Sequence, residues 1–525
     1  MKIEFAGSAL RRKFFSALGI GTSISIRRKL VYAALIFSIS FAVKSLHAVD
    51  LAPVMYTPDQ PAAGMAAEYD AQTRPIMEGR GILMPVPSDP SDTTALEHPP
   101  GYPIYLSAIY ATFGRSYYRV QLIQNAINSF SPVMLFLIAG MLLGWRVGLA
   151  SGIFAGIWHH LSYHSNLILP DSVCALPLLI GIYFLVKAER KKPASYALYA
   201  AAGLMIGLSV WLRANAMLMG PFLAVTLMVL SYQSSALARR RAVMALAAVL
   251  VIAPITIRNY LAFKQFVPVQ IGMGLNLWTA IGQSKGGERF GAPTYDNAVA
   301  RQEASLYNDP RYASSWYTPD GIERDHARLR KSLSVITGNP IWYTRAVLSR
   351  MAHMFNYSAE ASLVLKSNDT RFIEAGKRDR DEMAEKIAAG QPLTVKENPT
   401  ITPGHTLAAG EALFWLRPVA RAAQRIEKET VLFFMILGAL TSLVLSSRRS
   451  LLLMMVPAYY LLLQAMIHTE FRYTIPMHYF LFVLAATGWV LFATLSVEWL
   501  RSTYSRLAVS LQPGERPESV TEAGD

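Results

Sequence analysis

The chain has 525 residues, of which 53% are hydrophobic and only 16% are charged. A soluble domain carries about 25% charged residues, and the mean hydropathy here is +0.28, so an ordinary soluble enzyme is excluded. The net charge of +15 would suggest nucleic acid as the partner of a soluble protein. Here, however, the cationic residues gather in short loops between apolar runs, the pattern that controls membrane topology and contacts anionic membrane lipids. No nucleic-acid partner is therefore expected.

Apolar runs of about 18–20 residues, each long enough to cross a bilayer, predict an all-α polytopic membrane protein with about ten transmembrane helices. The runs fall at residues 30–43, 119–143, 147–169, 171–187, 195–212, 214–232, 242–263, 430–445, 451–468 and 475–495. If all ten cross, the basic loops at 189–192, 239–241 and 448–449 lie on the same side as the basic N-terminus. The positive-inside rule assigns that side to the cytoplasm.

This topology divides the chain into five parts. A long connection such as 264–429 is unusual without structure of its own, and its patterning predicts helices over 324–336 and 340–355. We therefore expect it to form an extracytoplasmic loop subdomain. The parts are the cytoplasmic N-terminus 1–29, the transmembrane core 30–263 with a first outer loop at 47–118, the loop subdomain 264–429, the C-terminal spans 430–497 and the cytoplasmic tail 498–525.

Charged side chains at the ends of the predicted spans are the first indication of a functional site. A charge at the centre of a membrane helix costs about 2.5–3.5 kcal/mol, so such residues are functional by default. Asp171, Arg213 and Arg258 stand at outer ends of spans, and Arg472 and Tyr473 lie in the outer turn before the last span. An ion path would be expected to place charges near the midplane. Their common side therefore predicts an active site at the outer interface.

The first outer loop and the third span add further candidates. Glu68, Tyr69 and Asp70 precede a rigid, proline-rich turn that contains His98, and a short apolar helix is expected over 102–110. In the third span, His160 and His164 have the i, i+4 spacing of a metal-binding pair. Packing of these histidines at the membrane interface is the alternative. The cofactor requirement is left open, with a divalent metal as one option.

The order of these motifs resembles the bacterial members of glycosyltransferase family 39. These membrane enzymes have the GT-C fold and are similar to protein O-mannosyltransferases and the lipid A aminoarabinose transferase. The residues that carry the resemblance are Tyr69, Glu78-Gly79, His98-Pro99-Pro100-Gly101-Tyr102-Pro103, Asp171, Trp211-Leu212-Arg213-Ala214-Asn215, Pro254-Ile255-Thr256-Ile257-Arg258-Asn259-Tyr260, Gly274-Leu275-Asn276-Leu277-Trp278 and Glu470-Phe471-Arg472-Tyr473-Thr474-Ile475-Pro476.

The resemblance implies a GT-C-like fold and a polyprenyl-phosphate-linked sugar donor. It also implies transfer to an envelope acceptor, whether lipid, polysaccharide or protein, on the outer face of the bacterial cytoplasmic membrane. A carboxylate of the first outer loop is implied as the catalytic group. The catalytic candidates are thus Glu68, Asp70 and Asp171, and the substrate-binding candidates are His98, Tyr69, Arg213, Arg258, Arg472 and Tyr473.

One departure from the family pattern leaves several alternatives open. The family acid stands three or four residues before the loop tyrosine, where this chain has Met65 and Ala66. The acid has shifted to Glu68 or Asp70, or it comes from Asp50 or Asp59, or catalysis is impaired. The displaced acid would suit a non-catalytic GT-C-like assembly protein. A membrane transporter or lipid flippase is the other alternative, and the sugar, the acceptor and the oligomeric state are left open.

Overall fold

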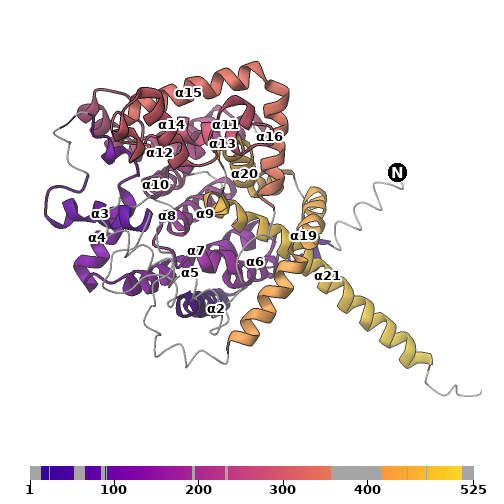
Figure 1. Ribbon diagram of the computed structural model, residues 1–525. Coiled ribbons are helices and arrows are strands. Elements are labelled where there is room, and N and C mark those ends of the chain that lie inside the picture. Colours follow the sequence, from indigo (N-terminus) through magenta and orange to yellow (C-terminus); the bar gives the residue numbers. More distant parts are fainter. Residues whose placement is uncertain are drawn as a thin grey trace, which may run out of the picture.

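The computed structural model describes residues 14–22, 24–51, 65–83, 89, 91–191, 195–230, 234–355, 416–445, 447–468 and 470–510. Within these ranges every regular element is a helix and no strand occurs, which confirms the predicted all-α fold. Figure 1 shows the helices gathered into one bundle, from which the C-terminal end of α21 (Ile475–Ser510) projects.

Five apolar stretches in the described part of the chain are long enough to cross a membrane, and four shorter apolar helices accompany them. The long stretches contain α2 (Ile26–Leu51), α5 (Tyr117–Leu143), α9 (Ala175–Arg190), α12 (Ser235–Phe263) and α21. The shorter ones contain α6 (Trp145–Ile157), α10 (Tyr196–Leu212), α11 (Met219–Leu230) and α20 (Ser447–Leu463). The predicted span 430–445 is the second half of α19 (Leu416–Leu445). Helices thus occur at every predicted span, while the number that cross a membrane stays a prediction.

The run predicted as a single span over 147–169 is not one helix. α6 ends at Ile157, and Trp158 leaves the helical region with a ψ of 124°. A short helix α7 (His159–His164) and a non-helical stretch follow, before α8 (Pro170–Val173). Trp158 is fully buried, so the break does not interrupt the apolar pattern from which the span was predicted.

Close helix contacts hold the bundle together. α5 packs on α2 and α6, α10 packs on α9 and α12, and α19 packs on α21. Gly148 allows α6 to approach α5, because a Cβ atom there would lie 2.6 Å from the carbonyl oxygen of Phe136. Small residues at such contacts are typical of membrane helices.

A second group of helices lies against the bundle. It comprises α13 (Met273–Gln283), α14 (Asp296–Tyr307), α15 (Gly321–Gly338) and α16 (Pro340–His353), near the top of Figure 1. α15 and α16 confirm the helices predicted at 324–336 and 340–355. Buried Glu303 on α14 pairs with Arg324 and Arg328 on α15 at 2.7 and 2.6 Å. This charge network fixes α14 against α15.

Candidate active site

The first outer loop contributes α3 (Met65–Met77) and α4 (Gly101–Phe113), and α4 confirms the predicted short apolar helix. Tyr69 on α3 is fully buried between two rings, stacked on His98 at 4.3 Å and edge-on to Tyr102 at 5.1 Å. The Tyr102 hydroxyl donates to Gln124 Oε1 on α5 at 2.9 Å. This stack fixes α3 and the proline-rich turn on the membrane bundle, and places Glu68 beside His98.

Polar side chains of α5 hold the loop before α8 and α8 itself, the short helix that carries Asp171. The Nε2 atom of Gln124 donates to the carbonyl oxygens of Ser165 and Leu167, at 2.9 and 2.6 Å. Asn128 donates to the hydroxyl of Ser172 at 2.9 Å. Because buried polar groups are costly unless paired, these bonds specify the irregular path of the loop.

Asp171 is buried, with 2% of its surface exposed, and it forms an ion pair with Arg213 at 3.3 Å. The guanidinium of Arg213 lies 4.6 Å from the centre of the Tyr473 ring, and that of Arg472 lies 5.0 Å from the same centre. Glu470 pairs with Arg472 at 2.5 Å. Two arginines thus share one aromatic ring, each beside a carboxylate.

The electrostatics of Glu470 agree with this arrangement. Burial alone would raise the pKa of this carboxyl, but hydrogen bonding to His468 and the charge of Arg472 outweigh it and lower the pKa to about 2. Glu470 is therefore ionised at neutral pH, and it neutralises part of the positive charge of Arg472.

These groups border a cavity of about 400 Å³ between the bundle and the α13–α14 region. Glu68, His98, Arg213, Arg472 and Tyr473 line it directly. Tyr69 and Asp171 are buried in contact with these lining residues, Tyr69 against His98 and Asp171 against Arg213. Seven of the predicted site residues therefore gather around one cavity.

Two predicted site residues have other surroundings. Asp70 accepts a hydrogen bond from Tyr110 at 2.8 Å and forms an ion pair with Arg115, so it ties α3 to the corner between α4 and α5. Arg258 donates to Asn259 Oδ1 at 3.0 Å and lies 5.8 Å from the Phe263 ring centre. It does not line the cavity. Asp59 lies outside the described residues, as does the side chain of Asp50.

A group of ligand atoms suitable for a metal ion occurs at Glu68, Glu97 and His98, whose ligand atoms lie within 4.8 Å of one another. Burial, and then the charge of Glu68, raise the pKa of Glu97 well above its usual value. Burial lowers the pKa of His98, which favours the neutral imidazole that binds metals. Two carboxylates beside a neutral histidine fit a divalent cation.

His160 and His164, predicted as a possible metal-binding pair, lie against an aromatic ring in the described structure. Both rings pack against Phe471, with centre distances of 4.6 and 5.6 Å. Neither histidine is part of the metal-ligand group found among the described residues. The packing alternative accounts for these contacts, and a metal at this pair stays a prediction.

Sequence reasoning did not include Glu97 and Glu470 among the site residues. Glu97 directly precedes His98 and the two prolines, so its position in the rigid turn was the available signal. Glu470 stands two residues before Arg472. At the position where the family resemblance expects an acid, the sulfur of Met65 lies 3.3 Å from a guanidinium nitrogen of Arg472.

Part of the chain matches a known protein family. Residues 97–257 match the dolichyl-phosphate-mannose-protein mannosyltransferase family. This match confirms the resemblance predicted from the sequence. The mannosyltransferase-like segment runs from Glu97 through Asp171 and Arg213 to Ile257. A comparison with curated proteins found no match.

The solved structures that are similar to the chain share little sequence identity with it, as two examples show. The oligosaccharyltransferase of Archaeoglobus fulgidus, in complex with Zn and sulfate, is 11% identical with a TM-score of 0.46, over 91% of this chain and 51% of that one. ArnT from Cupriavidus metallidurans, bound to undecaprenyl phosphate, is 15% identical with a TM-score of 0.33, over 89% of this chain and 78% of that one. The chain spans about half the length of the oligosaccharyltransferase.

Proposed function

We propose that the protein is a membrane glycosyltransferase that takes a sugar from a polyprenyl-phosphate-linked donor. The observation that carries this proposal is the pair of guanidiniums, Arg213 and Arg472, that share the ring of Tyr473 at the cavity wall. Arginines placed so close to one another favour an anion between them, and guanidinium geometry suits phosphate. The match of residues 97–257 to a family of sugar transferases supports the same assignment.

In the proposed reaction, an acceptor hydroxyl oxygen forms a bond to the anomeric carbon of the sugar. The bond from that carbon to the phosphate oxygen breaks, and its electron pair leaves with the lipid phosphate. Negative charge grows on this phosphate in the transition state, where Arg213 and Arg472 would stabilise it. Glu68, the half-buried carboxylate at the cavity, is the proposed base that takes the proton of the acceptor.

A divalent cation held by Glu68, Glu97 and His98 would supply positive charge close to the same phosphate. A Glu68 carboxylate engaged by a metal would not serve as a free base. A metal requirement would assign Glu68 to metal binding, and transfer without metal would leave Glu68 as the base. A chelator titration of the purified protein measures this requirement.

We further propose that the site faces the outside of a bacterial cytoplasmic membrane and that the acceptor belongs to the envelope. The basic loops at 189–192 and 239–241 support a cytoplasmic assignment for the ends of α9 and α12 that carry them. Asp171 and Arg213 lie at the opposite ends of the α8–α9 and α10 segments. A lipid-linked donor would enter this site from the membrane.

The experiment uses the full chain in lipid nanodiscs, supplied with undecaprenyl-phosphate-linked mannose and with donors carrying other sugars, together with an envelope lipid extract. We expect release of undecaprenyl phosphate and a labelled glycosylated product. Glu68→Gln and Arg472→Gln should each lower the rate by about ten-fold or more, a loss of about 1.4 kcal/mol of transition-state stabilisation. In a parallel assay with the chain in liposomes, donor that crosses the membrane unchanged would instead identify a flippase. An intact donor with no transport would favour a non-catalytic protein.

A further inference from the structure

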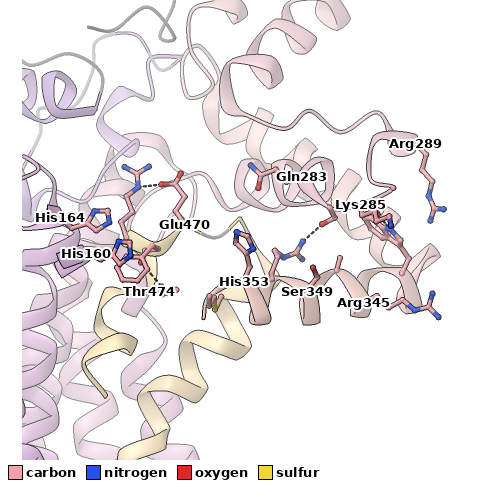
Figure 2. A pocket seen from close by; sticks show the side chains of 18 residues that line it. His160, His164, Gln283, Lys285, Arg289, Arg345, Ser349, His353, Glu470 and Thr474 are labelled. Carbon is pink, nitrogen blue, oxygen red and sulfur yellow. Dashed lines mark hydrogen bonds and ion pairs between the residues drawn. The ribbon is translucent and has the colours of Figure 1, made fainter. Parts of the chain in front are cut away.

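A second and larger cavity, of about 930 Å³, adjoins the candidate active site. Its walls are α16, the loop after α13, and the residues around α7 and Phe471. Gln283, Glu470 and Arg472 line both cavities, so the two meet at the Glu470–Arg472 ion pair. Figure 2 shows this ion pair near His160 and His164, with Lys285, Arg289 and Arg345 at the opposite end of the cavity.

The second cavity carries an excess of positive charge. Lys285, Arg289 and Arg345 are exposed at its wall, and none of them forms an ion pair with another described residue. Glu470 is the only carboxylate among the lining residues, and Arg472 already neutralises it. An unpaired cluster of this kind raises the local concentration of anions.

Hydrogen bonds and ring contacts fix the walls of this cavity. Arg350 of α16 donates to the carbonyl oxygen of Ala465 at 2.7 Å and to the hydroxyl of Ser284 at 2.6 Å, and so joins α16 to both walls. The indole nitrogen of Trp342 donates to the carbonyl oxygen of Lys285 at 3.0 Å. Arg289 lies over the rings of Phe290 and Trp342, at 4.6 and 5.6 Å. The volume is in the range of small-molecule sites, which combine aromatic walls with a few placed polar groups.

We propose that this cavity binds the acceptor, and that the acceptor is a saccharide bearing a phosphate or carboxylate group. The proposal rests on the proposed glycosyl transfer, which places the donor phosphate at Arg213 and Arg472. An acceptor hydroxyl must reach the sugar carbon beside that phosphate, and the shared wall at Glu470 and Arg472 is where the cavities meet. Lys285, Arg289 and Arg345 then hold the anionic group at the far end.

The test uses glucose 1-phosphate as the probe, with neutral glucose as its control, on the full chain in nanodiscs. Saturation-transfer difference NMR reports weak binding of either sugar. We expect saturable binding of glucose 1-phosphate and much weaker binding of glucose. The triple variant Lys285→Gln, Arg289→Gln, Arg345→Gln should weaken glucose 1-phosphate binding about ten-fold, since solvent screens each exposed charge and the three together still attract the anion.

Two matched variants make the result specific. The control triple Arg301→Gln, Arg330→Gln, Lys331→Gln removes three exposed cations of the same region that line neither cavity, and should leave binding unchanged. The charge-conserving variant Arg289→Lys, Arg345→Lys should retain most of the binding. Equal losses in both triples would overturn the proposal, as would equal binding of glucose and glucose 1-phosphate.

A competition experiment with two phosphates distinguishes failure of the acceptor proposal from failure of the proposed function. Farnesyl phosphate, a short prenyl phosphate, should bind together with glucose 1-phosphate. If farnesyl phosphate displaces the sugar phosphate, the cavity is the donor's phosphate site and the acceptor proposal fails while lipid-phosphate use stands. If the sugar phosphate binds as expected but no lipid-linked donor is consumed, the anion site stands and the proposed function fails.

Discussion

At the scale of single residues, Arg472 and Arg258 form a matched pair of arginines with different surroundings. Arg472 lies at the wall of both cavities and pairs with Glu470, whereas Arg258 lines neither and contacts Asn259 and Phe263. Lysine retains the charge but not the planar two-point geometry. We expect Arg472→Lys to lower sugar transfer about ten-fold or more, or about 1.4 kcal/mol, and Arg258→Lys to leave it near the wild-type rate. Transfer rates in nanodiscs at saturating donor measure both.

The opposite result would reassign the phosphate-binding role. Full activity of Arg472→Lys together with a large loss in Arg258→Lys would place the phosphate at Arg258, as the family resemblance allowed. Membrane insertion of each variant, measured by its yield after extraction, is the control for folding.

The metal-ligand group predicts a pH dependence of cation binding. Burial, and then the charge of Glu68, raise the pKa of Glu97, so a proton occupies this carboxyl to a higher pH than usual. Burial lowers the pKa of His98, so this imidazole loses its proton at a lower pH than usual. A cation must therefore displace a proton from Glu97 below the raised pKa, and we expect Mn²⁺ affinity to rise with pH up to that value.

Isothermal titration calorimetry in two buffers of different ionisation enthalpy measures the proton released by Mn²⁺ binding. Glu97→Gln should abolish the proton release and weaken binding, while Glu78→Gln, at an exposed carboxylate of the same loop, should do neither. Mn²⁺ affinity that is constant over pH 5–8 would contradict the prediction.

Charged residues in the sequence predicted some of the residues around the cavity, and there is a physical reason why they did so. Asp171, Arg213 and Arg472 were predicted because charges beside apolar spans are costly and therefore rare. Glu97 was not, because a carboxylate in a polar loop has no such cost until the fold buries it. The pairing of Asp70 with Arg115 depends on how the loop between α4 and α5 turns, and no spacing in the sequence indicates this.

At the scale of elements, α5 positions the loop that leads into α8, the short helix that carries Asp171. Gln124 alone bonds Tyr102, Ser165 and Leu167, so it joins α4, α5 and this loop. Replacing it by leucine leaves buried polar groups without partners, at about 1–3 kcal/mol each. We expect Gln124→Leu to lower both the unfolding temperature in detergent and the transfer rate. Gln302→Leu, at an exposed glutamine of α14, is the control.

The unfolding temperature and the transfer rate distinguish a positioning role of Gln124 from a general loss of stability. If Gln124 positions Asp171, the rate at saturating donor should fall even at temperatures well below unfolding. A variant that unfolds earlier but transfers at the wild-type rate when cold would show that Gln124 only stabilises the fold.

Apolar periodicity predicted helices but not where they break. Run length and hydropathy located α2, α5, α9, α12 and α21, because a membrane helix must satisfy its own backbone. The path of the non-helical stretch between α7 and α8 depends instead on long-range bonds, such as those from Gln124 to Ser165 and Leu167. Such bonds join residues 41 and 43 positions apart in the sequence, so apolar periodicity does not reveal them.

At the scale of the whole molecule, the basic loops and the site lie at opposite ends of the bundle. Glu189 at the end of α9 pairs with Arg241 near the start of α12 at 2.9 Å, and both side chains are buried. The basic loops that contain these residues are therefore neighbours, as predicted for loops on one side of a membrane. The sixteen residues of α9 span about 24 Å between this pair and the end of the helix next to Asp171.

This arrangement predicts opposite membrane sides for two exposed positions. Arg239 lies in the basic loop at the start of α12, and Glu323 is an exposed residue of α15, in the segment 264–429 predicted to lie outside. Single cysteines at each position, in a Cys174→Ala background, can be labelled with a membrane-impermeant maleimide in intact cells. We expect Glu323→Cys to react from outside and Arg239→Cys to react only after the membrane is opened, because cationic loops are retained in the cytoplasm.

Because the buried native thiol is already shielded, the wild-type chain serves as the unlabelled control. Labelling of Arg239→Cys alone from outside would place the site in the cytoplasm, where an acceptor of the outer envelope could not reach Arg213 and Arg472. Labelling of both positions from outside would show that the helices between them do not cross as an odd number of spans, and would reject the ten-span topology while leaving the geometry of the cavity intact.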